Sequence, residues 1–112
     1  MQDLMEQMNK LKADLHSSMK LLRQNGEVLA KKENAYQVKK AQAVLVMKSQ
    51  GCSITEIGLT LKGQPEVSDA LFERDMAKVM YEANQEHINV VKLELRVLEN
   101  QIAREWGNGG TA

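Results

Sequence analysis

The chain has 112 residues, enough for one domain and too few for two. Aromatic residues make up only 4% of it, which leaves little with which to stack bases or sugars. Its 15 basic and 15 acidic residues cancel, and this disfavours a generic polycation that coats DNA. The single cysteine, Cys52, excludes an internal disulfide framework and a cysteine-rich zinc site.

Helix-forming residues dominate the composition. Proline occurs once, at Pro65, whereas Leu, Met, Lys, Glu and Gln are abundant, so we expect an all-α protein. The longest apolar run, Ala43–Met47, is far too short to cross a membrane, and the N-terminal stretch lacks the layout of a signal peptide. We therefore expect a protein of the cytoplasm with no membrane partner.

The first predicted element is a long helix over residues 3–50, which contain no proline and one glycine. One row of residues recurs every seventh position: Met8, Leu15, Leu22, Leu29, Tyr36 and Ala43. This row passes Asn25 and Gly26 without changing phase, although Asn-Gly usually marks a turn. Because the row keeps its phase, we expect one continuous helix, with or without a kink at Gly26. A turn there, giving three helices, remains the alternative.

A connection over residues 51–64 follows, and it contains three glycines. Gly51 is placed to end the first helix. Ser53 and Glu56 have the spacing of a capping box, so we expect a short helix inside the connection. The second long helix is predicted over residues 65–106, with Pro65 at its first position. Gly107 is a stop signal, and residues 107–112 are expected to form a flexible tail after a single domain over residues 1–106.

The two long helices are expected to fold back on each other as an antiparallel, coiled-coil-like helical hairpin. Counting from the short connection, Leu22 should lie beside Leu95 and Tyr36 beside Tyr81. In the same register, Trp106 should lie near residues 8–11. A lone pair of helices has little core, so we expect a homodimer that forms a four-helix bundle, with a monomer as the alternative.

The self-association face is predicted where the hairpin seam is most apolar, near the chain termini. Its residues are Leu4, Met8, Leu11, Leu15, Leu22, Val90, Leu93, Val97 and Trp106. A basic group lies nearer the connection and consists of Lys31, Lys32, Lys39, Lys40 and Lys48. The acidic residues of 66–86 should neutralise this group across the seam. Contact with nucleic acid is the alternative use of the lysines.

No pattern predicts a catalytic residue, a bound metal or a cofactor. The two histidines, His16 and His87, have no second ligand at helical spacing. Cys52 has no histidine near it in the sequence. The stretch GCSITEIGLTLKG is similar to the first helix of a helix-turn-helix, but the run Lys62–Pro65 falls where the recognition helix should begin. We therefore expect a protein that is not an enzyme.

Two stretches resemble a known group of proteins. They are KAQAVLVMKSQGCSITEIGLTLKG (Lys40–Gly63) and ALFERDMAKVMYEANQEHINVVKLELRVLENQIAREW (Ala70–Trp106). The features that carry the likeness are the Leu-x-x-Lys-x-x-Gly before the connection, the Lys-Gly before the second helix, the Glu-Arg-Asp and the final Arg-Glu-Trp. These stretches are similar to small, uncharacterised helical-hairpin proteins encoded by temperate phages and prophages of Gram-positive bacteria. The resemblance implies an accessory role in a bacterial host and supplies no catalytic residues.

The expected function is therefore that of a phage accessory or adaptor protein, which binds an unidentified protein partner through its helix faces, with the connection as an exposed tip. Two alternatives stay open. One is a nucleic-acid-binding accessory factor in phage recombination or replication, which would use the five lysines. The other is an inhibitor of a host defence enzyme.

Overall fold

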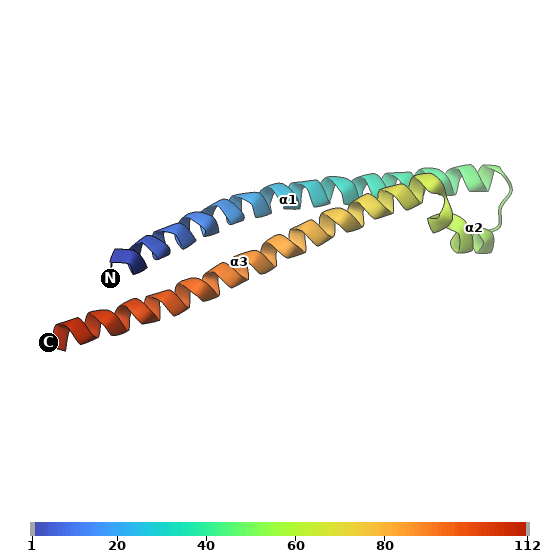
Figure 1. Cartoon of the computed structure of the whole chain (residues 1–112). Coiled ribbons are helices and arrows are strands. Elements are labelled where there is room, and N and C mark those ends of the chain that lie inside the picture. The colour runs from blue at the N-terminus through green and yellow to red at the C-terminus, as the bar shows by residue number, and fades with distance from the viewer. Residues whose placement is uncertain (1, 112) are drawn as a thin grey trace. The chain divides into compact units, whose positions relative to one another are not determined.

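A computed structural model of the chain describes the backbone of residues 2–111 and the side chains of residues 2–107 (Figure 1). The elements of this part of the chain are α1 (Gln2–Ser49), α2 (Ile54–Thr60), the short 3₁₀ helix η1 (Leu61–Gly63) and α3 (Pro65–Thr111). No strand occurs among the described residues. The all-α prediction is confirmed, and so is the short helix in the connection.

The first long helix is continuous through Gly26, as the unbroken phase of its apolar row predicted. It ends at Ser49, and Gly51, two residues further on, has a φ of 82°, which lies in the left-handed region that favours glycine. The Gly51 amide donates to the Lys48 carbonyl and the Cys52 amide donates to the Met47 carbonyl, each at 3.1 Å. This pair of hydrogen bonds is a Schellman motif, which satisfies carbonyls at the end of α1 and reverses the chain.

The second long helix begins at Pro65, as predicted, but it ends later than the sequence suggested. It passes Gly107 and continues to Thr111, whereas we expected a stop after Trp106. The φ of Gly107 is not positive, and no atom lies within 4 Å of the position where its β-carbon would stand. No chain reversal therefore ends the helix here. The rest of the predicted tail, Ala112, lies outside the described residues.

The chain divides into two compact units. The central unit is Asn25–Tyr81, and the terminal unit is Met1–Gln24 together with Glu82–Ala112. In both units, contacts join early residues of α1 to late residues of α3. Gly26 pairs with Tyr81 and Lys32 with Glu73 in the central unit. The helices are therefore antiparallel, and the helical-hairpin prediction is confirmed.

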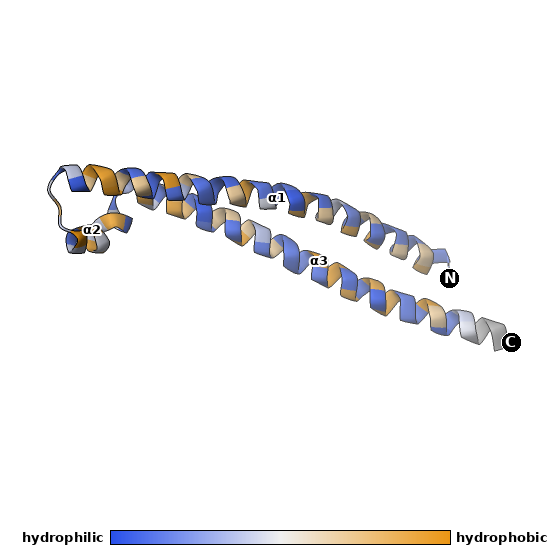
Figure 2. Cartoon of the chain, turned by 180° about the vertical axis from the view of Figure 1, so that it is seen from behind, coloured by the Kyte–Doolittle hydropathy of each residue, from blue (hydrophilic) through white to orange (hydrophobic). Residues whose placement is uncertain are grey.

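The core of the central unit lies where α1, η1 and the start of α3 meet. Tyr36, Ala43 and the fully buried Val67 form its centre, with Leu61, Ala70 and Leu71 packed around them. In α2, only Ile57 is buried. The core of the terminal unit comes mainly from α3, whose buried apolar residues there are Ile88, Val91, Leu95 and Leu98. Hydrophobic residues recur along α1 and α3 and occupy part of α2 (Figure 2).

The predicted register between α1 and α3 is wrong. Tyr36 lies under Arg74, whose guanidinium carbon is 5.2 Å from the ring centroid, and Tyr81 lies against Gly26 instead. The residue of α3 that lies beside Tyr36 is therefore Arg74 rather than Tyr81. The predicted and observed positions on α3 are two helical turns apart, about 10 Å. The connection explains the shift, because α2 and η1 lead the chain back along α1 before α3 begins. Val67 thus packs beside Ala43 rather than at the end of α1.

The same correction applies in the terminal unit. Leu22 borders a hollow with Gln85 and Ile88, whereas the sequence placed it beside Leu95. Leu11 borders another hollow with Leu98, so the expected contact of Trp106 with residues 8–11 is also wrong. Trp106 is instead largely exposed. A sequence pattern that repeats every seven residues fits several registers equally well, and the path of the connection selects one of them.

Candidate functional site

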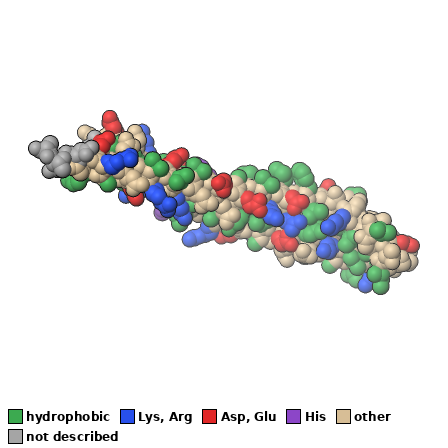
Figure 3. All heavy atoms as spheres, turned by 90° about the horizontal axis from the view of Figure 1, so that it is seen from below, with side chains coloured by type: hydrophobic (Ala, Val, Ile, Leu, Met, Phe, Trp, Pro, Cys, Tyr) green, Lys and Arg blue, Asp and Glu red, His purple; other side chains and the backbone are tan. Residues whose placement is uncertain are grey.

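The connection presents a capped, surface-exposed helix in the central unit. The Ser53 side chain accepts a hydrogen bond of 3.1 Å from the Glu56 amide, which fixes the start of α2. Ile57 anchors the helix by burying its side chain, whereas Ile54 and Leu59 remain 84% and 82% exposed. Figure 3 shows hydrophobic side chains gathered on the surface at the end of the central unit that carries α2. We call Ile54 and Leu59 the α2 surface.

An open hollow of about 550 Å³ lies in the same unit, between the last turns of α1 and the first turn of α3. Its apolar lining is Ala43, Leu45, Val46 and Met47. Its polar lining comes from Lys39, Gln42, Gln50, Gln64 and Glu66. None of these polar residues is positioned by an ion pair at the hollow, within the part of the chain that the structure describes. The hollow is open, and it combines apolar side chains of α1 with polar groups around them.

The five lysines predicted to act together have different surroundings. Lys32 forms an ion pair of 3.0 Å with Glu73, and the Lys40 ammonium lies 5.5 Å from the centroid of the Tyr36 ring. Lys31, Lys39 and Lys48 form no ion pair with the described residues. Lys39 and Lys48 are nine positions apart, which puts them on opposite sides of a helix. The lysines therefore do not make one basic face.

A tight polar cluster surrounds Tyr36 in the central unit. Arg74 donates to Glu33 at 2.9 Å and to Asp75 at 2.9 Å while its guanidinium lies over the aromatic ring. The hydrogen bond from Gln37 and the charge of Arg74 lower the pKa of the Glu33 carboxyl, against a partial desolvation that raises it. The predicted neutralisation of lysines on α1 by acids of 66–86 is present at Lys32 and Glu73, whereas at Glu33 and Arg74 the acid is on α1 and the base on α3.

The terminal unit contains a polar layer within its apolar seam. Asn84 is buried, and its side-chain amide donates to the backbone carbonyl of the buried Ser18 at 3.1 Å. The Ser18 hydroxyl donates to Asp14 at 3.2 Å, and Asp14 also lies 3.2 Å from His87 Nε2. No buried side-chain polar atom among the described residues lacks a partner. Ser18 and Asn84 stand out in the sequence as polar positions in the two seams, but the predicted register did not bring them together.

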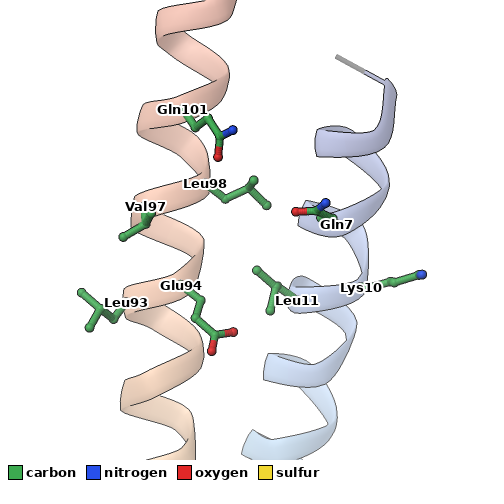
Figure 4. Close-up of a pocket in the computed structure, with 8 residues that line it drawn as sticks. All are labelled: Gln7, Lys10, Leu11, Leu93, Glu94, Val97, Leu98 and Gln101. Carbon is green, nitrogen blue, oxygen red and sulfur yellow. The ribbon is translucent and has the colours of Figure 1, made fainter.

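The predicted self-association face is divided by the structure. Its α1 residues are partly buried and face α3: Leu4, Met8, Leu11, Leu15 and Leu22. Its α3 residues are exposed: Val90, Leu93, Val97 and Trp106. An open hollow of about 570 Å³ lies beside them and is lined by residues of both helices, among them Leu11 and Leu98 (Figure 4). The terminal unit therefore leaves apolar surface uncovered on α3.

The described residues contain no cluster of metal ligands. No group of three His, Cys, Asp or Glu residues among them could hold a metal ion. His87 meets one carboxylate, and Cys52 is a partly buried thiol in the connection. No helix among the described residues is both long enough and apolar enough to cross a membrane.

Comparison with protein-family models, with curated proteins and with solved structures gives no match to this chain. The class of protein therefore rests on the fold itself, which is a helical hairpin with a helical connection. Its candidate functional features are exposed helix faces rather than an enclosed pocket.

Proposed function

We propose that the protein is a non-catalytic adaptor that binds another protein through the α2 surface. The observation that carries the proposal is the exposure of Ile54 and Leu59 on a helix that is otherwise well fixed. Ser53 caps this helix and Ile57 anchors it, so the two exposed side chains are presented rather than left by chance on a loose loop. Burying each of them against a partner is worth about 1.5–3 kcal/mol.

A short helix with apolar anchors is suited to a hydrophobic groove on another protein. Polar residues border the anchors here, since Glu56 and Lys62 lie on the same α2–η1 segment. An apolar centre with a polar rim is the usual anatomy of a protein interface. The accessory role that the resemblance to phage proteins implies fits this mode of action, as does inhibition of a host enzyme.

The test is affinity capture from a lysate of the source organism, with the full chain as bait. A partner enriched by the wild type should be lost with the double variant Ile54→Glu/Leu59→Glu. The matched control is Met19→Glu/Leu21→Glu, which changes two exposed apolar residues of α1 in the terminal unit. Equal capture by both double variants would contradict the proposal, and so would the absence of any protein specific to the wild type.

The nucleic-acid alternative has less support, because the lysines that lack an ion pair are distributed around α1. It is tested by fluorescence anisotropy of labelled single- and double-stranded oligonucleotides at low and moderate salt. Nonspecific phosphate contacts are strongest at low salt. Binding that weakens steeply with salt and falls further in Lys31→Glu/Lys39→Glu would favour this alternative over the adaptor.

A further inference from the structure

The two long helices contribute unequally to the core of the terminal unit. α3 buries four apolar side chains there, Ile88, Val91, Leu95 and Leu98. Among the described residues 2–24 of α1, the only buried one is the polar Ser18, and the apolar residues that face α3 are half-buried. The first half of α1 is therefore held to α3 by partial apolar contacts.

The central unit holds the second half of α1 more firmly. Tyr36, Ala43 and Met47 of α1 are buried in it, and Val67 of α3 is fully buried beside Ala43. Two ion pairs also join α1 to α3 within this unit. The connection closes the central unit, whereas the two stretches of the terminal unit are linked to each other only through the central unit.

A polar layer interrupts the apolar seam of the terminal unit. Asn84 donates to the Ser18 carbonyl at 3.1 Å, and His87 Nε2 lies 3.2 Å from Asp14. When the helices separate, these groups exchange their partners for water, so the net cost of breaking a polar contact is small. Separation at this layer therefore costs less free energy than exposure of a buried apolar layer would.

Packing between the two helices is also incomplete in the terminal unit. An open hollow of about 570 Å³ is bordered by Leu11 and Leu98, which point toward each other in Figure 4. A second open hollow, of about 470 Å³, is bordered by Leu22 and Ile88. Side chains that line a hollow lack contacts on one side, and the attraction between the helices is weaker for it.

We propose that the terminal unit opens in one step while the central unit stays folded. Residues 2–24 of α1 leave α3, and the seam of Ile88, Val91, Leu95 and Leu98 becomes exposed. The separation runs through the whole unit, because no apolar residue of α1 within it is buried deeply enough to stop it. A helix that has lost its packing partner is marginal in water, so the backbone hydrogen bonds of residues 2–24 break as well.

This opening is a conformational device built into the hairpin, since it makes an apolar seam of α3 accessible in one state and covered in the other. It lies in the terminal unit and does not involve the α2 surface. Ile54→Glu/Leu59→Glu should therefore leave the opening unchanged, and the adaptor proposal and this proposal can fail separately.

Native-state hydrogen exchange of the full chain tests the opening within a single helix. We expect the amides of residues 8–22 to share one free energy of exchange and one urea slope, with protection at least about 100-fold lower than that of residues 36–47. Equal protection of the two segments overturns the proposal. Protection that falls residue by residue toward the start of α1, without dependence on urea, shows fraying of the helix end and overturns it as well.

Thiol labelling tests whether the seam of α3 becomes exposed. With Cys52 replaced by serine, Val91→Cys and Ala77→Cys place a thiol at a buried position of the terminal and the central unit, respectively. A water-soluble disulfide reagent should label Val91→Cys at least about 100-fold faster than Ala77→Cys, because only the terminal unit opens. Equal labelling rates would show that the two units unfold together. Far-UV circular dichroism of each variant confirms that the helices are intact.

The role of the polar layer is tested by Asn84→Leu, which replaces the buried amide with an apolar side chain. We expect protection of residues 8–22 to rise about 10-fold, while that of residues 36–47 stays unchanged. The matched control is Asn100→Leu, which changes an exposed asparagine of α3 in the same unit and should leave both segments as in the wild type. Equal effects of the two substitutions on residues 8–22 would contradict the role of this layer.

Discussion

Replacing Gly26 with alanine should stabilise the protein. Gly26 lies in the interior of the continuous helix α1, where glycine is about 1 kcal/mol less favourable than alanine. A β-carbon at this position would stand 3.4 Å from Cε2 of Tyr81, which is an ordinary van der Waals distance. The new methyl group therefore fits and gains contact with the ring. We expect Gly26→Ala to raise the free energy of unfolding by about 1 kcal/mol.

The assay is urea unfolding followed by far-UV circular dichroism, at one protein concentration so that association does not alter the comparison. Tyr81→Ala and the double variant complete a double-mutant cycle, which separates helix propensity from contact with the ring. In the Tyr81→Ala background, Gly26→Ala should still raise the free energy of unfolding, because this stabilisation arises mainly in the backbone of α1. Gly26→Leu should destabilise the protein, since its larger side chain has to displace the ring.

A loss of stability in Gly26→Ala would refute this reasoning. It would mean that Tyr81 cannot tolerate the methyl group at 3.4 Å or that α1 needs glycine's conformational freedom at this point. The double-mutant cycle distinguishes these two causes. Tyr81→Ala removes crowding at the ring, but it leaves a backbone requirement for glycine in α1 unchanged. Gly58→Ala is a useful reference, since no atom lies within 4 Å of the new β-carbon and only the propensity of α2 changes.

Three further predictions follow from the described contacts. Gly51→Ala should lower the free energy of unfolding by about 1–2 kcal/mol in the same urea assay, because φ is 82° there; an unchanged midpoint would contradict this. Asn84→Ala should cost about 1 kcal/mol by removing the hydrogen bond to Ser18, whereas Asn84→Leu should recover the loss by burying an apolar side chain in its place; unchanged stability of Asn84→Ala would contradict the contribution of this hydrogen bond. Folding lowers the pKa of Glu33, so its carboxylate stabilises the fold above the ordinary value of 4.5, and this contribution is lost as pH falls through the lower pKa of the folded state. Glu33→Gln should therefore lose less stability on acidification than the wild type, as measured by urea midpoints from neutral to acid pH, and parallel profiles would contradict the assignment.

Local sequence signals determined most of the helical structure correctly. Gly51, Ser53 and Pro65 each act through neighbours within a few residues, and the helix end, the cap and the helix start that they predict are all present. The end of α3 was missed because Gly107 is a stop signal only where the chain turns, and the helix continues straight through it. A single glycine permits a turn without requiring one.

The register and the functional surfaces depend on long-range geometry that the sequence does not display. The seven-residue repeat of α1 fits α3 at several offsets, and the folded path through α2 and η1 sets the one observed. For the same reason, the contacts of Asp14 with His87 and of Glu33 with Arg74 were not anticipated. Leu93 and Val97 were singled out from the sequence, but only the structure shows that they point away from α1.

The terminal unit is built from two stretches of chain that the central unit separates. During synthesis, residues 2–24 emerge first, and the 57 residues of Asn25–Tyr81 must follow before the matching stretch of α3 exists. That interval lasts about 3–11 s at about 5–20 residues per second. The central unit is continuous and can fold during the wait, whereas the start of α1 has no helix to cover it. The surface that carries Val90, Leu93 and Val97 can therefore form only after the whole central unit has been synthesised.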